Sequence, residues 1–184
     1  QLGDIFFDFQ GLSEKKELAQ SLRTHLTAII GRGPIILQTM FEEEANRHVA
    51  LNFFGRLKKE RGTHSHRDKV NLKHGGIMPL VGAVRLLALR NGIEATSTIR
   101  RINLLQERGV FNAEEADDLI ETSRQISRIL LRQQLRDFQA GANVSNYVSP
   151  ASLFRRERKT LIGALKTVDS LQDKVRMVFT ASVF

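Results

Sequence analysis

The chain has 184 residues, which is enough for one domain with a hydrophobic core and too few for two domains of ordinary size. It contains no cysteine, which excludes disulfide bonds, thiolate metal sites and thiol catalysis. The formal net charge is +8, but the basic residues are spread along the chain and aromatic residues make up only 7% of it. Binding of nucleic acid is therefore not favoured, because single strands need stacked aromatic side chains beside the basic ones.

No apolar segment near the N-terminus resembles a signal peptide or a membrane anchor, so we expect a cytoplasmic protein without a membrane partner. Because the first residue is Gln1 and not methionine, we expect a piece excised from a longer protein. Residues 1–12 include the strand-like sequence DIFFDF, which we interpret as a linker or strand-like segment that contacts an upstream domain. Residues 13–184 are expected to form a single helical domain.

Two helices are predicted next along the chain. Ser13 can cap the first of them, whose apolar residues recur at helical spacing on one side. These apolar residues are Leu18, Leu22, Leu26 and Ile29. Gly31 and Gly33 are expected to end the first helix, and Pro34 is expected to begin the second.

Residues 51–73 follow no helical or strand pattern. The sequence NFFGR at Asn52–Arg56 is expected to turn across the core with its two phenylalanines. Several potential metal ligands follow in or near a predicted surface loop, namely His64, His66, Asp68 and His74. A metal site and free histidines are both open interpretations, and we favour free histidines because a loop does not fix ligand geometry.

The segment from Gly75 to Leu89 is almost entirely apolar, and its apolar residues occupy nearly every direction of a helical wheel. Such a helix is normally buried on all sides, and this one is too short to cross a bilayer. Pro79 suits its first turn, and Asn91-Gly92 suits its end. We expect Gly75-Gly76 to form a tight turn with bare backbone N–H groups before the helix.

Arg85 is the one charged side chain in this segment, and we expect it to be partly desolvated. A buried arginine needs a partner. One interpretation is an ion pair with a carboxylate of a neighbouring helix, for which Glu42–Glu44 supply candidates. The other is an arginine that binds an anion beside the Lys73–Gly76 turn.

Three further helices are predicted in the second half of the chain. Residues 96–98 can cap a short helix, and Asn112 with Glu115 forms a capping box for a long helix that ends near Phe138. The long helix carries a row of arginines on its polar side, and Gln134 on its apolar side is expected to be hydrogen-bonded. The row consists of Arg124, Arg128, Arg132 and Arg136, and it is interpreted as a solvated face or as a ridge that docks an acidic partner. Ser149-Pro150 is expected to open the last helix.

Together these segments predict an all-α fold, an antiparallel helical bundle of about six helices around a buried central helix, with no sheet. The common catalytic motifs are missing from the sequence. There is no Gly-x-x-x-x-Gly-Lys loop, no Gly-x-Ser-x-Gly elbow, no His-Glu-x-x-His helix, and no Gly-Ser followed by Asp-x-Asp. We therefore expect no catalytic residues and no metal ligands in this chain, and no activity from it alone.

The sequence NLKHGGIMPLVGAVRLLALRNGIEATSTIRRINLLQERGVFNAEEADDL from Asn71, with LLRQQL from Leu130 and LQDKVRMVF from Leu171, carries a family resemblance. It resembles the nucleotidyltransferase substrate-binding domain. That domain is the C-terminal part of bacterial signal-transduction proteins that also carry cyclic-nucleotide-binding and CBS domains. The turn at Leu72–Ile77 is also remotely similar to an element of PII uridylyltransferases and glutamine synthetase adenylyltransferases. Where the family is expected to have aspartate before Leu72, this chain has Asn71.

The resemblance implies an accessory domain that packs against a polymerase-β-like catalytic domain upstream in the same chain. The nucleoside triphosphate and Mg²⁺ would belong to that upstream domain, with no cofactor in this fragment. Lys73, Gly75, Gly76 and Arg85 are the candidate substrate-binding residues, for a phosphate or an acidic protein acceptor. The glycines could instead serve only to permit a tight turn. The alternative function is a regulatory interaction module that forms a homodimer and has no catalytic role.

Overall fold

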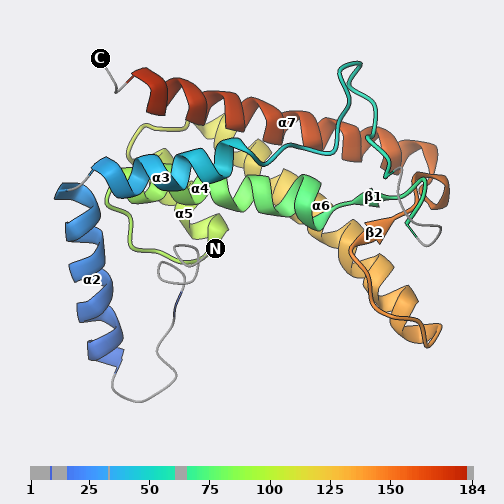
Figure 1. Ribbon diagram of the computed structural model, residues 1–184, viewed down its shortest axis with the longest axis horizontal. Coiled ribbons are helices and arrows are strands. Elements are labelled where there is room, and N and C mark those ends of the chain that lie inside the picture. Colours follow the sequence, from blue (N-terminus) through green and yellow to red (C-terminus); the bar gives the residue numbers. More distant parts are fainter. Residues whose placement is uncertain (1–8, 10–15, 33, 61–65, 182–184) are drawn as a thin grey trace.

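The computed structural model describes residue 9 and residues 16–32, 34–60 and 66–181. Its main elements are six α-helices (Figure 1). These are α2 (Lys16–Arg32), α3 (Pro34–Ala45), α4 (Met78–Arg90), α5 (Thr98–Glu107), α6 (Ala113–Gln139) and α7 (Arg155–Thr180). The predicted all-α class is confirmed. Among the described residues, no helix is long and apolar enough to span a bilayer.

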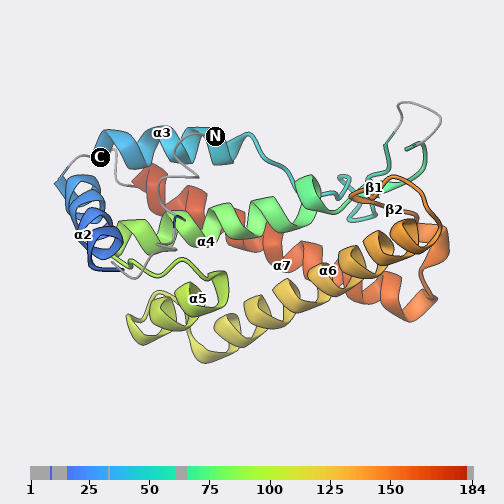
Figure 2. The ribbon, with the colours of Figure 1, turned by 90° about the horizontal axis from the view of Figure 1, so that it is seen from below.

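Helix α4 lies at the centre of the bundle, as its sequence predicts. It contacts α2, α3, α5 and α7, and Figure 2 shows it between α3 on one side and α5 and α6 on the other. From Leu80 to Leu89 every residue except Val81 is buried, including Arg85. Each fully buried leucine contributes roughly 1.5–3 kcal/mol through removal of its side chain from water. The absence of a polar face on this helix therefore forces the other helices to surround it.

Helices α6 and α7 run antiparallel beside each other and bury the apolar seams that their sequences predict (Figure 2). An ion pair joins the two helices near each end. Arg132 Nη1 lies 2.5 Å from Glu157 Oε1, and Lys174 Nζ lies 2.7 Å from Glu115 Oε1. Since the two pairs are far apart along the helices, they fix the axial position of one helix against the other.

The predicted signals for helix ends are largely confirmed. Asn112 Oδ1 accepts a hydrogen bond from the N–H of Glu115 at 2.9 Å, and the Glu115 carboxylate accepts one from the N–H of Asn112 at 2.9 Å. The Ser97 side chain caps α5 by accepting from the N–H of Arg100. Gly92 ends α4 with φ +63°, a conformation that glycine adopts without strain.

The prediction of no sheet is wrong in one detail. Residues Val70–Asn71 (β1) and Tyr147–Val148 (β2) pair antiparallel, with Val70 opposite Val148. Each strand has only two residues, too few to show the alternating pattern by which strands are recognised. The sheet ties the segment before α4 to the segment after α6.

The predicted start of the last helix is also wrong. Pro150 opens a separate single turn, η2 (Pro150–Ser152), and the chain is extended at the buried Leu153. Helix α7 then begins at Arg155, where Glu157 accepts a hydrogen bond from the N–H of Phe154 at 3.0 Å. Burial of Leu153 therefore separates the proline turn from the helix.

The break expected at Gly31 and Gly33 separates α2, which continues one residue past Gly31 to Arg32, from α3, which begins at Pro34 as predicted. Gly33 and the expected cap Ser13 lie outside the described residues. One smaller expectation in the first part of the chain is wrong. The turn at Asn52–Arg56 does not cross the core, because Phe53 and Phe54 are 98% and 81% exposed. This turn is held instead by Asn52, whose side chain accepts from the N–H groups of Phe54 and Arg56.

The polar side of α6 matches its predicted environment. Arg124, Arg128 and Arg136 are exposed, and Arg132 is held in the pair with Glu157. Gln134 is hydrogen-bonded, as expected, with its Nε2 donating to Asn146 Oδ1 at 3.1 Å. The arginine row is thus largely a solvated face, interrupted by one tie to α7.

The Arg132–Glu157 pair predicts how stability depends on pH. The hydrogen bond from Arg132 lowers the pKa of the Glu157 carboxyl below its ordinary value of 4.5. A carboxyl with a lowered folded pKa stabilises the protein fully above its unfolded pKa, and loses this contribution as the pH falls through the folded value. We expect Glu157→Gln to lose less free energy of unfolding than the wild type when urea titrations at pH 7 are compared with titrations below pH 4.5.

The matched control is Asp169→Asn, an exposed carboxylate on the same helix. This variant should keep the wild-type loss of stability in acid. The prediction would be contradicted if Glu157→Gln lost as much free energy of unfolding as the wild type between pH 7 and acid pH.

Candidate functional site

The segment between β1 and α4 is a π-helical turn, η1 (Lys73–Ile77), and not the tight turn that the glycine pair predicts. The N–H of Ile77 donates to the carbonyl of Leu72 at 3.0 Å, so the turn is closed over six residues. Asn71 caps it by accepting from the N–H of His74 at 3.1 Å. An aspartate could accept the same bond, so Asn71 preserves the capping role of the residue expected there. The turn continues into α4 without a break.

Close packing explains the glycine pair. A Cβ on Gly75 would lie 2.5 Å from the Cβ of Ala50, and the Gly75 carbonyl accepts from the N–H of Ala50 at 2.8 Å. A Cβ on Gly76 would lie 3.1 Å from the Ile126 side chain on α6. Both glycines are buried, and neither has a positive φ. This geometry favours the structural interpretation of the glycines, and anion binding by their amides stays a prediction.

The surroundings of Arg85 favour its structural interpretation as well. The side chain is buried, at 8% exposure. One helical turn earlier, a Cβ on Gly82 would meet the carboxylate of Glu44 at 2.1 Å, so α3 presses an acidic side chain against α4 at this level. Glu44 also lies 3.0 Å from Arg47 Nε. Glu44 therefore lies against the central helix one turn from Arg85, and the ion pair expected for Arg85 stays a prediction.

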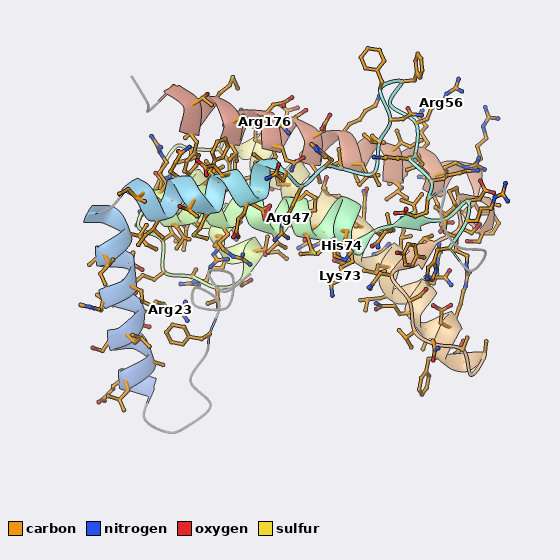
Figure 3. The ribbon with its side chains drawn as sticks, viewed as in Figure 1. Arg23, Arg47, Arg56, Lys73, His74 and Arg176 are labelled. Carbon is orange, nitrogen blue, oxygen red and sulfur yellow. The ribbon has the colours of Figure 1, made fainter. Side chains whose placement is uncertain are left out.

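Only Lys73 of the four candidate binding residues is exposed (Figure 3). The neighbouring His74 is exposed too, whereas Gly75, Gly76 and Arg85 are buried. Lys73, Gly75 and Gly76 lie together in η1, whereas Arg85 lies in α4, roughly 18 Å beyond Lys73 along the helix axis, so the four residues do not form one surface. Of these residues, Lys73 is the one that a ligand in solution can reach directly.

A groove of about 490 Å³ opens beside η1, between the segment that follows α3 and the segment before β1. Its cationic or imidazole side chains come from three parts of the chain, namely Arg47 and His48, Lys58 and Lys59, and His74. Glu60 is the acidic residue of its lining. Figure 3 shows Arg47 and His74 near the start of α4. This arrangement suits a ligand with negative charge, because several donors converge on one space.

Backbone contacts build the groove. The N–H of Lys58 donates to the carbonyl of Ala50 at 2.9 Å, and Leu51 pairs with Leu57 in an isolated antiparallel bridge. On the other side, Gln172 Nε2 on α7 donates to the carbonyl of Arg47 at 2.7 Å. The segment at 46–50 is thus fixed from α7, from η1 and from the segment at 57–60. Side chains carried by fixed backbone lose less entropy when a ligand binds.

A second hollow of about 820 Å³ adjoins the groove and shares Lys58, Lys59 and Glu60 with it. Its lining also contains Phe53 and Asp68. Lys59 Nζ lies 3.4 Å from Asp68 Oδ1, and both side chains are well exposed. The two hollows give an acceptor larger than a single phosphate room to lie along this side of the domain.

The histidine cluster does not form a metal site within the described ranges, where no group of three or more potential ligands comes together. The ring of His66 stacks on Tyr147 with centroids 3.9 Å apart. Asp68 contacts Lys59, and His74 lines the groove. His64 lies outside the described residues.

Sequence reasoning missed four residues of the groove, namely Arg47, His48, Lys58 and Lys59. They belong to segments without helical or strand periodicity, so the sequence contains no pattern that places them side by side. The one sequence signal that could have indicated the groove was the pair of adjacent lysines, Lys58 and Lys59, before the histidine loop. The hydrogen bonds of Ala50 with Gly75 and Lys58 and the bridge between Leu51 and Leu57 bring these segments together.

A sequence profile of the family described as "Putative nucleotidyltransferase substrate binding domain" matches residues 34–179. The chain belongs to this family. No curated protein and no solved structure matches it.

The matched region of this substrate-binding domain runs from the start of α3 almost to the end of α7. It includes the groove, η1 and the central helix, and it leaves α2 outside. The parts that build the groove are therefore parts of the family domain, whereas α2 precedes it.

The contact between Gly75 and Ala50 can be tested through stability. We expect Gly75→Ala to destabilise the substrate-binding domain by about 1–3 kcal/mol, because the new Cβ forces Ala50 and its hydrogen bond to move. The matched control is Gly163→Ala on α7, where an added Cβ meets nothing within 4 Å. Alanine there should stabilise the helix by about 0.5–1 kcal/mol. Urea unfolding followed by circular dichroism measures both changes, and a Gly75→Ala variant as stable as the wild type would show that the contact is not tight.

Proposed function

We propose that this domain binds the acceptor substrate for a nucleotidyltransferase domain that lies upstream in the same protein. The groove carries the proposal. Its lining contains three cationic side chains and two histidines against a single carboxylate. An acceptor with a phosphate or with acidic side chains would satisfy these donors, whereas a neutral acceptor would leave them unpaired.

The cationic residues of the groove differ in mobility. Arg47 is held by Glu44, so its guanidinium provides a fixed point of recognition. Lys58 and Lys59 are exposed and can follow the charge of a bound group. Lys73, beside the groove on η1, would extend this positive surface. Gly75 and Gly76 would contribute by fixing the turn, and Arg85 by stabilising the helix that follows it.

The catalytic chemistry would belong to the upstream domain. In this proposal a polymerase-β-like domain supplies the metal-binding aspartates, Mg²⁺ and the nucleoside triphosphate, and the present domain forms one wall of the cleft. The described residues hold no group that fits a metal ion. The parent would be a cytoplasmic signal-transduction protein of the kind that carries CBS and cyclic-nucleotide-binding domains.

Helix α2 supports this packing arrangement. Its C-terminal end packs on the bundle through the buried Ile30, and further contacts are polar, with Gln20 Nε2 donating to Glu94 Oε2 at 2.7 Å and Arg23 Nη1 donating to the Glu94 carbonyl at 3.2 Å. Nearer its N-terminal end, Leu18 and Leu22 are 70% and 48% exposed. Apolar side chains that recur on one side of a helix and lie in water mark a surface for a partner. Since α2 precedes the family domain, we propose that the upstream domain covers the exposed leucines of α2.

A regulatory interaction module is the second candidate function. The observation that favours it is a row of exposed residues along α6, from Asp117 to Phe138, none of which lines the groove. Both functions can coexist in one protein, because they use different surfaces.

The groove can be tested with defined anionic probes. We expect pyrophosphate and a fluorescein-labelled hexaglutamate peptide to perturb the amide resonances of residues 46–50, 58–60 and 73–78 in an NMR titration. Lys58→Ala/Lys59→Ala should weaken peptide binding by about thirtyfold, since each of the two lost charge-assisted contacts is worth on the order of 1 kcal/mol in a solvated groove. The control is Arg155→Ala/Arg156→Ala, which removes the same charge from exposed positions at the start of α7. Equal losses in the two double variants would mean that the peptide responds only to net charge.

The division of labour can be tested by activity. The fragment alone should transfer no nucleotide from a Mg²⁺-bound nucleoside triphosphate to hexaglutamate or to a protein acceptor. The longer protein with its upstream domain should do so. Within that protein, Leu18→Ser/Leu22→Ser should lower transfer because α2 loses its apolar contact, and Met177→Ser, at another exposed apolar position, should not. Transfer by the isolated fragment would contradict the proposal.

A further inference from the structure

The outward side of α6 carries an uninterrupted row of exposed residues. Their spacing alternates between four and three, which places them along one line of the helix. The row consists of Asp117, Glu121, Arg124, Arg128, Leu131, Leu135 and Phe138. All of them point away from the buried side of α6, which contains Leu119 and Ile126. Figure 2 shows α6 at the edge of the bundle, opposite α3.

The chemistry of this row changes along the helix from acidic to basic to apolar. Leu131, Leu135 and Phe138 are 63%, 56% and 72% exposed. Within the part of the chain that the structure describes, no ion pair involves the two acidic residues or the first two arginines of the row. The helix dipole accounts for Glu114 and Glu115 in the first turn, but its effect falls off before the acidic and basic residues of the row.

The row is unfavourable as long as it faces only water. Like charges four residues apart on a helix repel each other, and Asp117–Glu121 and Arg124–Arg128 are both such pairs, against the one attractive spacing within the row, Glu121–Arg124. The three apolar side chains remain hydrated at the same time. A partner that brings basic groups to the acidic half and acidic groups to the basic half would remove the repulsion, and contact of that partner with the apolar side chains would remove them from water.

We propose that two copies of this chain associate through antiparallel packing of α6 against α6. In this arrangement Asp117 lies opposite the partner's Arg128, and Glu121 lies opposite the partner's Arg124. Two-fold symmetry repeats both pairs, so four ion pairs form at the centre. In the same register Leu131 of each copy lies opposite Glu114 in the first turn of the other α6, and Leu135 and Phe138 lie beside the α5–α6 turn, where Val110 is half-buried.

Other occupants fit only half of the row. An anionic membrane surface or a nucleic acid would attract Arg124 and Arg128 but would repel Asp117 and Glu121 on the same line. An acidic helix of another protein would meet the same repulsion. A second copy of α6 is complementary along the charged part of the row, because it carries the same charges in the opposite order.

The test is a charge exchange followed by measurement of mass in solution. We expect the wild type to sediment as a dimer at tens of micromolar protein, and to dissociate in about 1 M salt, where screening acts within about 3 Å. Asp117→Arg/Glu121→Arg and Arg124→Glu/Arg128→Glu should each raise the dimer Kd by on the order of a hundredfold, because all four pairs become repulsive. An equimolar mixture of the two variants should form a heterodimer, in which every pair is again attractive.

The matched control is Arg155→Glu/Arg156→Glu, which changes the same charge away from α6 and should remain dimeric. Circular dichroism must show native helix content in each variant, and recovery of the dimer on mixing proves that both are folded. A monomeric wild type, a dimer that survives either reversal, or variants that stay apart on mixing would each overturn the proposal. None of these outcomes bears on the groove, whose test measures ligand binding.

Discussion

The close approach of Gly75 to Ala50 is the contact on which the candidate site depends. The Cβ of any larger residue at position 75 would lie 2.5 Å from the Ala50 methyl, so only glycine lets the two backbones meet through a hydrogen bond. Ala50 in turn holds Lys58 through its carbonyl. Two backbone hydrogen bonds of Ala50 therefore align three segments, at 46–50, 57–60 and 73–77. The glycine pair contributes to the groove through this packing, whether or not its amides touch a ligand.

Sequence alone predicted those parts of the fold that depend on periodicity and on local chemistry. The burial of α4 follows from an apolar surface in every direction, and the start of α6 follows from the side chains of Asn112 and Glu115, which accept hydrogen bonds from each other's backbone N–H groups. The positions of β1, β2 and the start of α7 depend on pairing and burial between distant segments, as the burial of Leu153 illustrates. No local pattern contains that information.

The candidate site shows the same limit. The sequence pointed to the turn before α4, where Lys73 is exposed and His74 lines the groove, and a role of this turn in binding stays a prediction. It could not separate exposed from buried members of that turn, because a glycine required for close packing and a glycine required for anion binding look identical in sequence. Arg47 and Lys58 belong to irregular segments, and only the fold shows that they share one space.

The two surfaces are compatible because they rely on different parts of the bundle. The groove is built from irregular segments that α7 and η1 hold in place, whereas the row on α6 belongs to a single regular helix. Figure 2 shows α6 on the side of the bundle opposite α3 and the segment that follows it. Pairing through α6 would therefore leave both grooves open and facing away from the dimer axis. A protein arranged in this way could bind two acceptors at once, and each copy of α2 would remain available to its own upstream domain.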